Sequence, residues 1–325
     1  MSPGQPFLYL APIRGITDCL YRNLFFEHFS GFDGAVAPFI NPQRFSRLKR
    51  KQLADILPEN NSVDIIPQLL HTDGDDFLAL AKRLQDLGYQ HLNWNLGCPA
   101  PMVTRKKRGS GFLPYPDEII TFLDRVIPRL TAQLSIKMRL GFETAKESEI
   151  LLPLLNDFPL KEIIIHSRTG KQRYRGQTDP KAFGRCRELS RHELVYNGDL
   201  VTVASFQKLE NKFPGINRWM IGRGALSNPF LGEEIKGKTI HPDERHHRLA
   251  TFHTALFNRY QERLSGPSHL LSRMKLIWSY WAESFPQEKK LIKKILRAKT
   301  LPRYQQVTSK LFHKDSPEKN NHSVY

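Results

Sequence analysis

The chain has 325 residues, of which 40% are hydrophobic, and it carries a formal net charge of +17. A hydrophobic share of this size supplies a sizeable core and excludes wholesale disorder. The three cysteines (Cys19, Cys98 and Cys186) are far apart, which excludes a disulfide framework and a cysteine-based zinc site. Free thiols fit a reducing compartment, so we expect a cytoplasmic protein.

The excess of positive charge indicates an anionic partner, usually nucleic acid or a membrane surface. No apolar stretch approaches the roughly 20 residues that span a bilayer. The apolar run from Phe7 to Ile13 also lacks the flanks of a secretory signal. We therefore expect no membrane association and a protein that acts as a monomer. The charge alone is explained equally well by a nucleic-acid partner and by an ordinary basic enzyme.

Eight short β-rich runs recur along the first two thirds of the chain, separated by stretches long enough for helices such as Phe77–Leu87 and Asp117–Leu130. The runs are Leu8–Ile13, Gly34–Ile40, Asp64–Leu70, His91–Leu96, Leu134–Leu140, Glu162–His166, Glu193–Tyr196 and Arg218–Ile221. Strands that alternate with helices predict parallel pairing, and eight such units match the α/β class and a (β/α)8 TIM barrel. The alternative is an open doubly wound sheet.

Polar or glycine-rich clusters follow nearly every one of these runs. In a barrel these carboxyl ends converge on one face, where barrel active sites lie. An open dinucleotide-binding sheet would instead place G-x-G-x-x-G after its first strand. Here the first run continues into Ala-Pro-Ile-Arg-Gly-Ile-Thr-Asp, which is not that fingerprint. The barrel is therefore favoured.

The composition changes near Gly237–Pro242, after which strand-like runs cease and helical periodicity appears at His247–Leu264, His269–Ser284 and Glu288–Lys299. Residues 241–325 hold 16 Lys and Arg against 7 Asp and Glu, about half of the net charge in a quarter of the chain. We therefore predict a barrel domain over 1–240 and a small, basic, helical domain over 241–325. The polar end from about Lys314 is expected to fray.

Cys98 lies in Asn95-Leu96-Gly97-Cys98-Pro99, at the end of the fourth run. A thiol with an ordinary pKa near 8.5 is mostly protonated at neutral pH and is able to act as a general acid. A neighbouring cation would instead make it a nucleophile. A buried structural cysteine is the third interpretation.

A run of four cations begins a few residues after Cys98 and comprises Arg105, Lys106, Lys107 and Arg108. Its position beside a candidate catalytic cysteine predicts a grip on a substrate phosphate backbone. A solvated surface loop is the alternative.

Glycines follow the last two runs, in Asn197-Gly198-Asp199 and Gly222-Arg223-Gly224. Glycine allows backbone N–H groups to approach an anion closely, and barrels often bind a cofactor phosphate at these two loops. Arg223 would add a charged contact. Two ordinary turns are the alternative.

Three further polar residues lie at strand ends: Gln68, Lys137 and His166. A lysine in such a place is able to stabilise negative charge on a reduced flavin, and a glutamine offers hydrogen bonds to a heterocycle edge. Each is also explained as a satisfied polar residue inside the barrel.

Taken together, these segments resemble the tRNA-dihydrouridine synthases in order and spacing, over about residues 8–230. The resembling segments are Ala11–Asp18, Asn95–Pro99, Lys137–Gly141, His166–Thr169, Asn197–Asp199 and Met220–Gly224. The helical end fits the family's C-terminal domain. The resemblance implies an FMN-binding barrel that uses NADPH to reduce the flavin, a hydride transfer to C6 of a uridine in tRNA, and Cys98 as the donor of the proton to C5.

The resemblance also assigns roles to residues. Those matching the FMN site are Pro12, Ile13, Arg14, Gln68, Lys137, His166, Asn197, Gly198, Asp199, Gly222 and Arg223. Asn95, Arg139 and Arg168 match the substrate side. The chain departs from the family at Ile13, usually methionine, at Pro101-Met102, where many members carry a lysine, and at Arg173, often glycine. The last two departures border the expected RNA position.

Extrusion of a uridine from folded tRNA requires a broad cationic surface. The candidates in the helical domain are Arg273, Lys275, Lys289, Lys290, Lys293, Lys294 and Arg297. Trp278, Tyr280 and Trp281 lie among them and are expected to pack in the core. Two other functions compete: a flavin barrel acting on a free small molecule, against which the basic helical domain argues, and a non-catalytic RNA-binding barrel, against which the intact Cys98 and Lys137 argue.

Overall fold

A computed structural model of the chain describes residues 4–41 and 49–312. It divides into two compact units. The first comprises Met1–Ala225 and Pro229–Thr239, and the second comprises Leu226–Asn228 and Ile240–Tyr325. None of the helices within the described ranges combines the length and apolarity required to cross a bilayer.

The first unit is built on one parallel sheet with the strand order β3-β2-β1-β9-β8-β7-β6-β5-β4. The strands are β1 (Phe7–Leu10), β2 (Gly34–Val36), β3 (Ile65–Ile66), β4 (Gln68–Leu69), β5 (His91–Leu96), β6 (Gln133–Gly141), β7 (Leu160–Thr169), β8 (Leu194–Asn197) and β9 (Arg218–Ile221). Every pair in this sequence of neighbours is parallel. The continuous parallel order confirms the α/β class.

The two ends of this order, β3 and β4, are halves of one extended segment interrupted only at Pro67. β3 pairs with β2 and β4 pairs with β5, so this single segment closes the ring. Pro67 has no N–H to give to a ladder, although its carbonyl still accepts from the backbone N–H of Asn93 at 2.9 Å. The nine strands are thus the eight predicted ones with the third divided, and the TIM barrel is confirmed.

Two predicted strands extend further than the observed ones. β1 ends at Leu10 and β2 at Val36, whereas the runs were predicted to continue to Ile13 and Ile40. Pro12 and Pro38 follow these ends, and proline removes the ladder donor. Ile40 nevertheless returns to the sheet through an isolated parallel bridge with Leu69.

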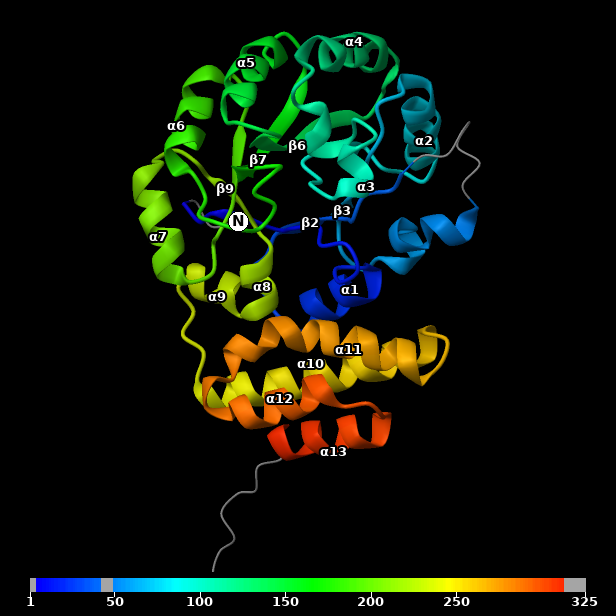
Figure 1. Cartoon of the computed structure of the whole chain (residues 1–325), viewed down its shortest axis with the longest axis vertical. Coiled ribbons are helices and arrows are strands. Elements are labelled where there is room, and N and C mark those ends of the chain that lie inside the picture. Colours follow the sequence, from blue (N-terminus) through cyan, green and yellow to red (C-terminus); the bar gives the residue numbers. More distant parts are fainter. Residues whose placement is uncertain (1–3, 42–48, 313–325) are drawn as a thin grey trace, which may run out of the picture. The chain divides into compact units, whose positions relative to one another are not determined.

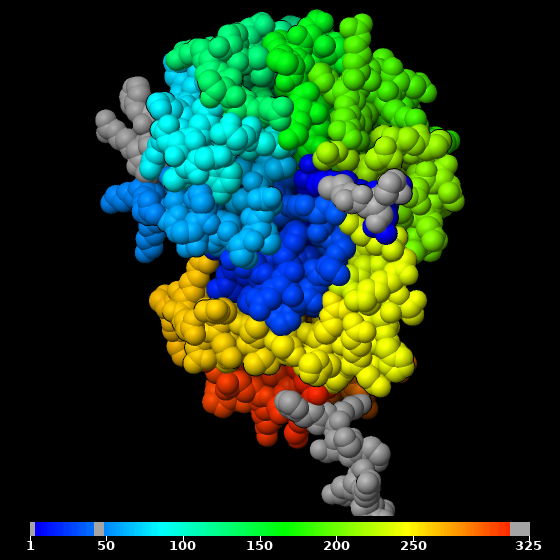
Figure 2. Space-filling model, turned by 180° about the vertical axis from the view of Figure 1, so that it is seen from behind, coloured from blue at the N-terminus to red at the C-terminus, as the bar shows by residue number. Residues whose placement is uncertain are grey.

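Most helices of the first unit cover the outside of the ring of strands, whereas the short helix Pro101–Thr104 lies in the loop after β5 (Figure 1). The helices of this unit are α1 (Cys19–His28), α2 (Gly74–Asp86), α3 (Pro101–Thr104), α4 (Pro116–Val126), α5 (Lys146–Leu155), α6 (Pro180–Leu189), α7 (Val203–Lys212), α8 (Arg223–Ser227) and α9 (Leu231–Ile235). Several begin at a side-chain cap: Asp18 on α1, Asp73 on α2 and Asp179 on α6. Seen from behind, the dark blue N-terminal surface lies beside the light blue surface that follows β2 (Figure 2), as the β1–β2–β3 pairing requires.

The second unit consists of α10 (Pro242–Arg263), α11 (Pro267–Trp281), α12 (Lys289–Arg297) and α13 (Leu301–Phe312). Its core contains the fully buried rings of Trp278 and Trp281, as predicted, whereas Tyr280, predicted to pack with them, is only half-buried. Tyr304 of α13 accepts from Trp278 Nε1 at 2.8 Å and lies 2.6 Å from Nε2 of His253. α13 was not predicted, although the proline in its first turn is typical of a helix start. The stretch expected to fray, from Lys314, lies outside the described residues.

Candidate active site

The polar ends of the strands meet inside one mouth of the barrel. The strand register aligns Asn95 with Lys137, Arg139 with His166, and His166 with Asn197. Lys137 of β6 reaches past β7 and donates to Oδ1 of Asn197 on β8 at 3.2 Å. The interior of the barrel mouth therefore brings together side chains that are far apart in the sequence.

Lys137 is the most strongly perturbed cation of this group. Burial, followed by the positive charge of Arg139, lowers its pKa from 10.5 to about 7, although the nearby Cys98 opposes the shift. At neutral pH this ammonium is close to its midpoint. An anionic group at the mouth would gain more from Lys137 than from a solvated lysine, because the surrounding dielectric is low.

Cys98 follows β5 and is held through its backbone. Its N–H donates to Oδ1 of Asn95 at 2.8 Å, and its carbonyl accepts from both N and Oγ of Ser110 at 3.1 Å. Gly109 lies against it with φ +57°, and a Cβ there would approach the Cys98 carbonyl oxygen to 2.6 Å. The loop between these residues is thus closed at its base, and only glycine fits at position 109.

The thiol of Cys98 is half-buried. Burial raises its pKa above the ordinary value, against the opposing effects of a backbone hydrogen bond and of nearby cations, including Arg14 and Arg139. The group is therefore a protonated thiol at neutral pH. This environment favours a proton donor over a ready nucleophile.

His166 presents an unsatisfied nitrogen in the same interior. It is nine-tenths buried, and no described residue is a hydrogen-bond partner of its Nδ1. Burial lowers its pKa well below 6.5, and neighbouring cations, led by Arg139 and Lys137, add to the effect. The ring is neutral, and its orphaned nitrogen is the kind of group that a bound ligand satisfies.

The end of β7 is tied to the loop after β8 through Asp199. Nη1 of Arg168 donates to Oδ1 of Asp199 at 2.9 Å, and Nη2 binds the other oxygen of the same carboxylate. Arg223 binds Oδ1 as well, at 2.8 Å. Burial opposes ionisation of Asp199, but the hydrogen bond and charge of Arg168 outweigh it, and the pKa is lowered. Arg168 is thus bound to this carboxylate, and its contact with substrate stays a prediction.

Arg139 is also occupied within the chain. Its Nε donates to Gly97 O at 3.0 Å, and Nη1 donates to Thr169 O at 2.7 Å and to Arg173 O at 2.6 Å. These three carbonyls belong to the loop after β5, to the last residue of β7 and to the loop after β7. The side chain predicted to contact substrate therefore braces two loops of the mouth.

Tyr174, in the loop after β7, is a candidate that the sequence interpretation did not identify. Its ring is 56% exposed. The guanidinium carbons of Arg139 and Arg223 lie 5.4 and 5.2 Å from the ring centroid. The preceding Arg173 has φ +51°, an uncommon conformation for a non-glycine residue. An exposed aromatic ring held between two cations provides a stacking surface, which its lone position in a loop did not reveal.

The segment after β1 lines another side of the mouth. The backbone of Ile13 is fixed by Thr17, whose Oγ1 accepts from Ile13 N at 2.8 Å. Arg14 is exposed, with its guanidinium carbon 5.5 Å from the centroid of Phe39. Pro12 is partly buried.

The glycines after β8 and β9 allow close approach of the backbone. A Cβ on Gly198, whose φ is +147°, would come within 2.9 Å of Thr178 Cγ2. A Cβ on Gly222 would meet Ala11 at 3.4 Å and occupy space beside Ile13. The absence of a side chain at Gly222 thus leaves space for a ligand beside Ala11 and Ile13, which follow β1.

The predicted cationic run after Cys98 is divided by the fold. Arg105 and Lys106 are exposed, and no hydrogen bond or ion pair within residues 4–41 and 49–312 engages their side chains. Lys107 turns back, pairing with Glu118 at 3.1 Å and lying 3.9 Å from the ring centroid of Tyr115. Two of the four cations are therefore available for a substrate.

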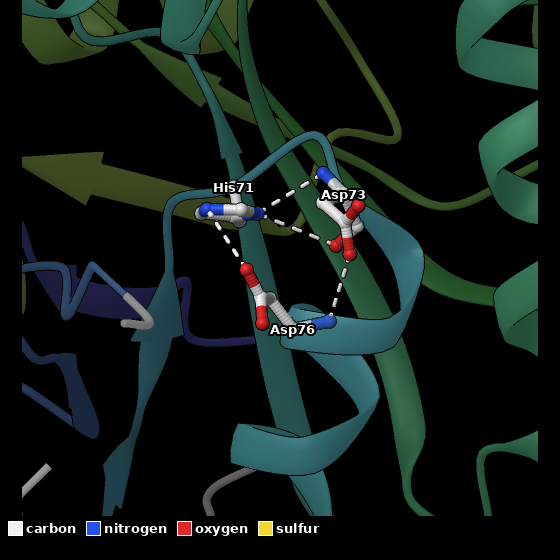
Figure 3. A group of neighbouring side chains, drawn as sticks. All are labelled: His71, Asp73 and Asp76. Carbon is white, nitrogen blue, oxygen red and sulfur yellow. Dashed lines mark hydrogen bonds and ion pairs between the residues drawn. The ribbon is translucent and has the colours of Figure 1, made fainter. Parts of the chain in front are cut away.

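Arg108 is bound to a polar cluster at the end of β4. Its Nη2 lies 2.6 Å from Nε2 of His71, and its Nη1 donates to Asn41 Oδ1 at 2.9 Å. Figure 3 shows His71 beside Asp73 and Asp76, whose ligand atoms lie within 4.8 Å of one another. Burial lowers the pKa of Arg108, and the charges of Asp76 and Asp73 oppose this shift without reversing it. The guanidinium thus binds Nε2 of His71, the same ring nitrogen that lies 3.9 Å from Oδ2 of Asp76.

In the second unit, α12 and α13 border a cationic cavity of about 560 Å³. It is lined by Lys290, Lys293, Lys294, Arg297, Ala298, Lys299, Thr300 and Arg303. Lys289 is exposed on the same helix. Arg273 and Lys275 are instead used internally: Arg273 stacks on Tyr260 at 4.9 Å, and Lys275 donates to Ala298 O at 3.0 Å. Lys299 and Arg303 were not among the predicted contacts, and Arg303 lies on α13, which was not predicted.

Known proteins resemble the chain over both units. The tRNA-dihydrouridine(16) synthase of Vibrio vulnificus (strain CMCP6) is 25% identical over 324 residues, covering 94% of this chain and 96% of that protein. The tRNA-dihydrouridine(16) synthase of Cupriavidus necator is 26% identical over 293 residues, with 87% and 90% covered. The tRNA-dihydrouridine synthase B of Pasteurella multocida (strain Pm70) is 27% identical over 226 residues, with 69% and 67% covered.

Among solved structures, morphinone reductase superimposes with a TM-score of 0.50 at 13% identity, over 74% of this chain and 88% of its own. This likeness shows the barrel fold alone. A family model described as dihydrouridine synthase (Dus) matches residues 9–313. Because this match includes the strand ends, the Cys98 loop and the second unit, the chain belongs to the dihydrouridine synthase family of oxidoreductases.

Proposed function

We propose that this protein reduces the C5=C6 bond of a uridine in tRNA, with FMN as its cofactor and NADPH as the reductant. The observation that carries the proposal is a protonated thiol, Cys98, at the mouth of a barrel whose interior holds the low-pKa Lys137. Reduction of this bond requires a hydride at one carbon and a proton at the other. The mouth provides the proton donor, and its cations would stabilise the negative charge of a reduced cofactor.

The residues of the mouth fit FMN. The orphaned Nδ1 of the neutral His166 requires a partner, and Lys137 gains from an anionic one. Gln68, Lys137 and His166 would hold the ring and ribityl chain. The loops after β8 and β9, with Asn197, Gly198, Gly222 and Arg223, would hold the phosphate, since barrels bind phosphates there. Pro12, Ile13 and Arg14 would border the ring from the first strand.

Asp199 needs a different role from the phosphate contact first predicted. A carboxylate whose pKa is lowered stays charged and would repel a phosphate. It binds Arg168 and Arg223 instead, so we assign it the orientation of Arg223 toward the phosphate.

The hydride for C6 of the uridine would come from FMN held by these residues, with NADPH as the source of the electrons. Cys98 donates its proton to C5, which leaves a thiolate that regains a proton from solvent. The raised pKa keeps the thiol loaded before this step. Asn95 fixes the Cys98 backbone, Arg139 braces the loops on either side, and the exposed ring of Tyr174 offers a stacking surface to an extruded base.

The same proposal assigns tRNA binding to the exposed cations. Arg105 and Lys106 lie beside the Cys98 loop, and the cavity between α12 and α13 is lined by six Lys and Arg residues and no acidic one. Such a cavity fits the phosphates of an RNA backbone. The barrel, over 1–240, would then be catalytic and the helical region, over 241–325, would bind RNA. The protein would act on tRNA and NADPH in the cytoplasm.

Position 16 of tRNA is the first target to test, because the two relatives matched over both units are tRNA-dihydrouridine(16) synthases. The test is incubation of the flavin-loaded protein with NADPH and unmodified tRNA, followed by mass spectrometry of nuclease fragments. A mass gain at one uridine is expected. Reduction of free uridine as readily as tRNA would favour the competing small-molecule reductase, and no product with either would refute the proposal.

A further inference from the structure

Four buried polar side chains form a continuous hydrogen-bonded series across β4, β5 and β6. Asn95 Nδ2 donates to Gln68 Oε1 at 2.6 Å, and Gln68 Nε2 donates to Asn93 Oδ1 at 2.7 Å. Asn93 Nδ2 then donates to Ser135 Oγ at 2.8 Å. Gln68, Asn93 and Ser135 are fully buried, and Asn95 is 7% exposed. We call these four residues the amide series.

The direction of the series is set at the Cys98 loop. The backbone N–H groups of Gly97 and Cys98 only donate, so the Asn95 atom that they contact at 3.0 and 2.8 Å is Oδ1. Nδ2 of Asn95 must then face Gln68, and the atom that it meets must be an acceptor. Because Gln68 Oε1 is this acceptor, its Nε2 faces Asn93 and requires Oδ1 there. Nδ2 of Asn93 then faces Ser135, whose hydroxyl oxygen accepts the last hydrogen bond.

One orientation of each amide therefore satisfies the whole series. Turning over the Gln68 amide alone would bring two N–H groups together at Asn95 and two oxygens together at Asn93. In a buried site each such mismatch leaves polar groups unsatisfied, at a cost of about 1–3 kcal/mol per group. Gln68 keeps one N–H on Nε2 and one lone pair on Oε1 for another partner.

We propose that Asn93 and Ser135 are positioning residues for the active site, acting in two directions. Asn95 sets the orientation of the Gln68 amide, and Asn93 and Ser135 hold the amide in that orientation. Through Gln68 they also support Asn95, which holds the backbone of Cys98. Neither residue needs to touch substrate. This inference rests on the proposed function for its consequence in catalysis, but the arrangement of Gln68 and Cys98 is testable without turnover.

The test compares Asn93→Leu and Ser135→Ala with Asn93→Asp. Leucine has a similar volume and no side-chain hydrogen bonds. Alanine removes the last acceptor together with the contacts of Ser135 Oγ with His91 Nε2 and Leu92 O. Aspartate accepts from Gln68 in either protonation state and reaches Ser135 as donor or acceptor, so it should restore the series. The matched control is Asn156→Leu, which removes hydrogen bonds to Leu189 O and Arg191 N at 2.9 and 2.8 Å, away from the series.

Three measurements follow: the FMN dissociation constant with the flavin absorption spectrum, the alkylation rate of Cys98 by iodoacetamide in flavin-free protein, and kcat with KM for tRNA. Asn93→Leu should shift the flavin bands, raise alkylation of Cys98 several-fold and lower kcat about tenfold or more, with KM unchanged. Ser135→Ala should change the flavin bands, the alkylation rate and kcat in the same direction as Asn93→Leu, but by smaller amounts. Asn93→Asp should resemble wild type.

If Asn93→Leu and Ser135→Ala only lower the melting temperature, as Asn156→Leu does, the positioning role is overturned. If Asn93→Leu fails to fold, Ser135→Ala decides: an unchanged flavin spectrum and alkylation rate also overturn it. A wild-type protein that binds FMN but forms no dihydrouridine refutes the proposed function alone, because the spectral and alkylation measurements still report on the series.

Discussion

Arg108 and His71 are joined by a contact of 2.6 Å between Nη2 and Nε2. Arginine only donates, so His71 is the acceptor and its ring is neutral. Burial, followed by the charge of Arg108, lowers the pKa of His71, which keeps it neutral at physiological pH. Arg108 also donates to Asn41. The loop that begins at Cys98 is thereby attached to two other segments of the barrel mouth.

Arg108→Ala should therefore loosen this loop. We expect faster hydrogen exchange over residues 101–108 and a loss of about 1.5–3 kcal/mol of unfolding free energy, typical for hydrogen bonds to a charged group. The control is Lys106→Ala, which removes an exposed cation from the same loop and should leave exchange unchanged. Equal exchange in both variants would show that Arg108 does not anchor the loop.

Cys98→Ala should leave FMN bound and lower dihydrouridine formation about 100-fold or more, the usual contribution of a general acid. The measurement is single-turnover product formation with reduced flavin. Cys186→Ala, which removes a fully buried thiol from α6, should keep the wild-type rate. Unchanged product formation with Cys98→Ala would remove the thiol from the mechanism.

Strand periodicity and the ends of strands were enough to predict the barrel and to bring Gln68, Lys137 and His166 to one mouth. These follow from alternation along the chain and from the parallel order, which local sequence reports well. The break at Pro67 also leaves a local signal, but its effect is only to divide one predicted strand.

Whether each arginine of the mouth is free or bound to other residues could not be predicted from the sequence in the same way. Arg139, Arg168 and Arg108 all looked like substrate contacts, yet each is bound to partners from other segments: backbone carbonyls, Asp199 and His71. Whether a long side chain is free depends on loops that fold back from distant positions. For the same reason the amide series, which joins three strands, leaves no recognisable spacing in the sequence.

Lys137 predicts a pH dependence of stability in the flavin-free protein. Its pKa falls from 10.5 in an unfolded chain to about 7 in the fold. Between these values the unfolded state binds more protons, so stability should rise with pH, by at most about 1.4 kcal/mol per pH unit. Below pH 7 the full penalty of the buried charge applies.

The measurement is urea unfolding of wild type and Lys137→Met between pH 6 and 10. The difference in unfolding free energy should favour the variant at pH 6 and shrink as the pH rises. Comparison with Lys106→Met removes the contribution of an exposed lysine. Parallel curves for wild type and Lys137→Met would mean that Lys137 titrates like a solvated lysine.

The cationic cavity of the second unit predicts a salt-dependent contribution to RNA binding. Lys294→Gln combined with Arg303→Gln removes two of the six cations that line it. Each lost phosphate contact lowers the slope of log affinity against log salt by about 0.7–0.9. We therefore expect weaker binding of unmodified tRNA and a slope smaller by about 1–2, measured by fluorescence anisotropy at several salt concentrations.

The matched control is Lys310→Gln combined with Arg259→Gln, which removes the same charge from exposed positions of α13 and α10 outside the cavity. A purely global effect of net charge would weaken tRNA binding equally in both double variants, because long-range attraction depends on total charge. Only a cavity that contacts phosphates makes the affinity for tRNA lower in Lys294→Gln/Arg303→Gln than in the control double variant. Since the cavity lies in the helical unit, the first pair should also raise KM for tRNA while kcat and bound flavin stay at wild-type values.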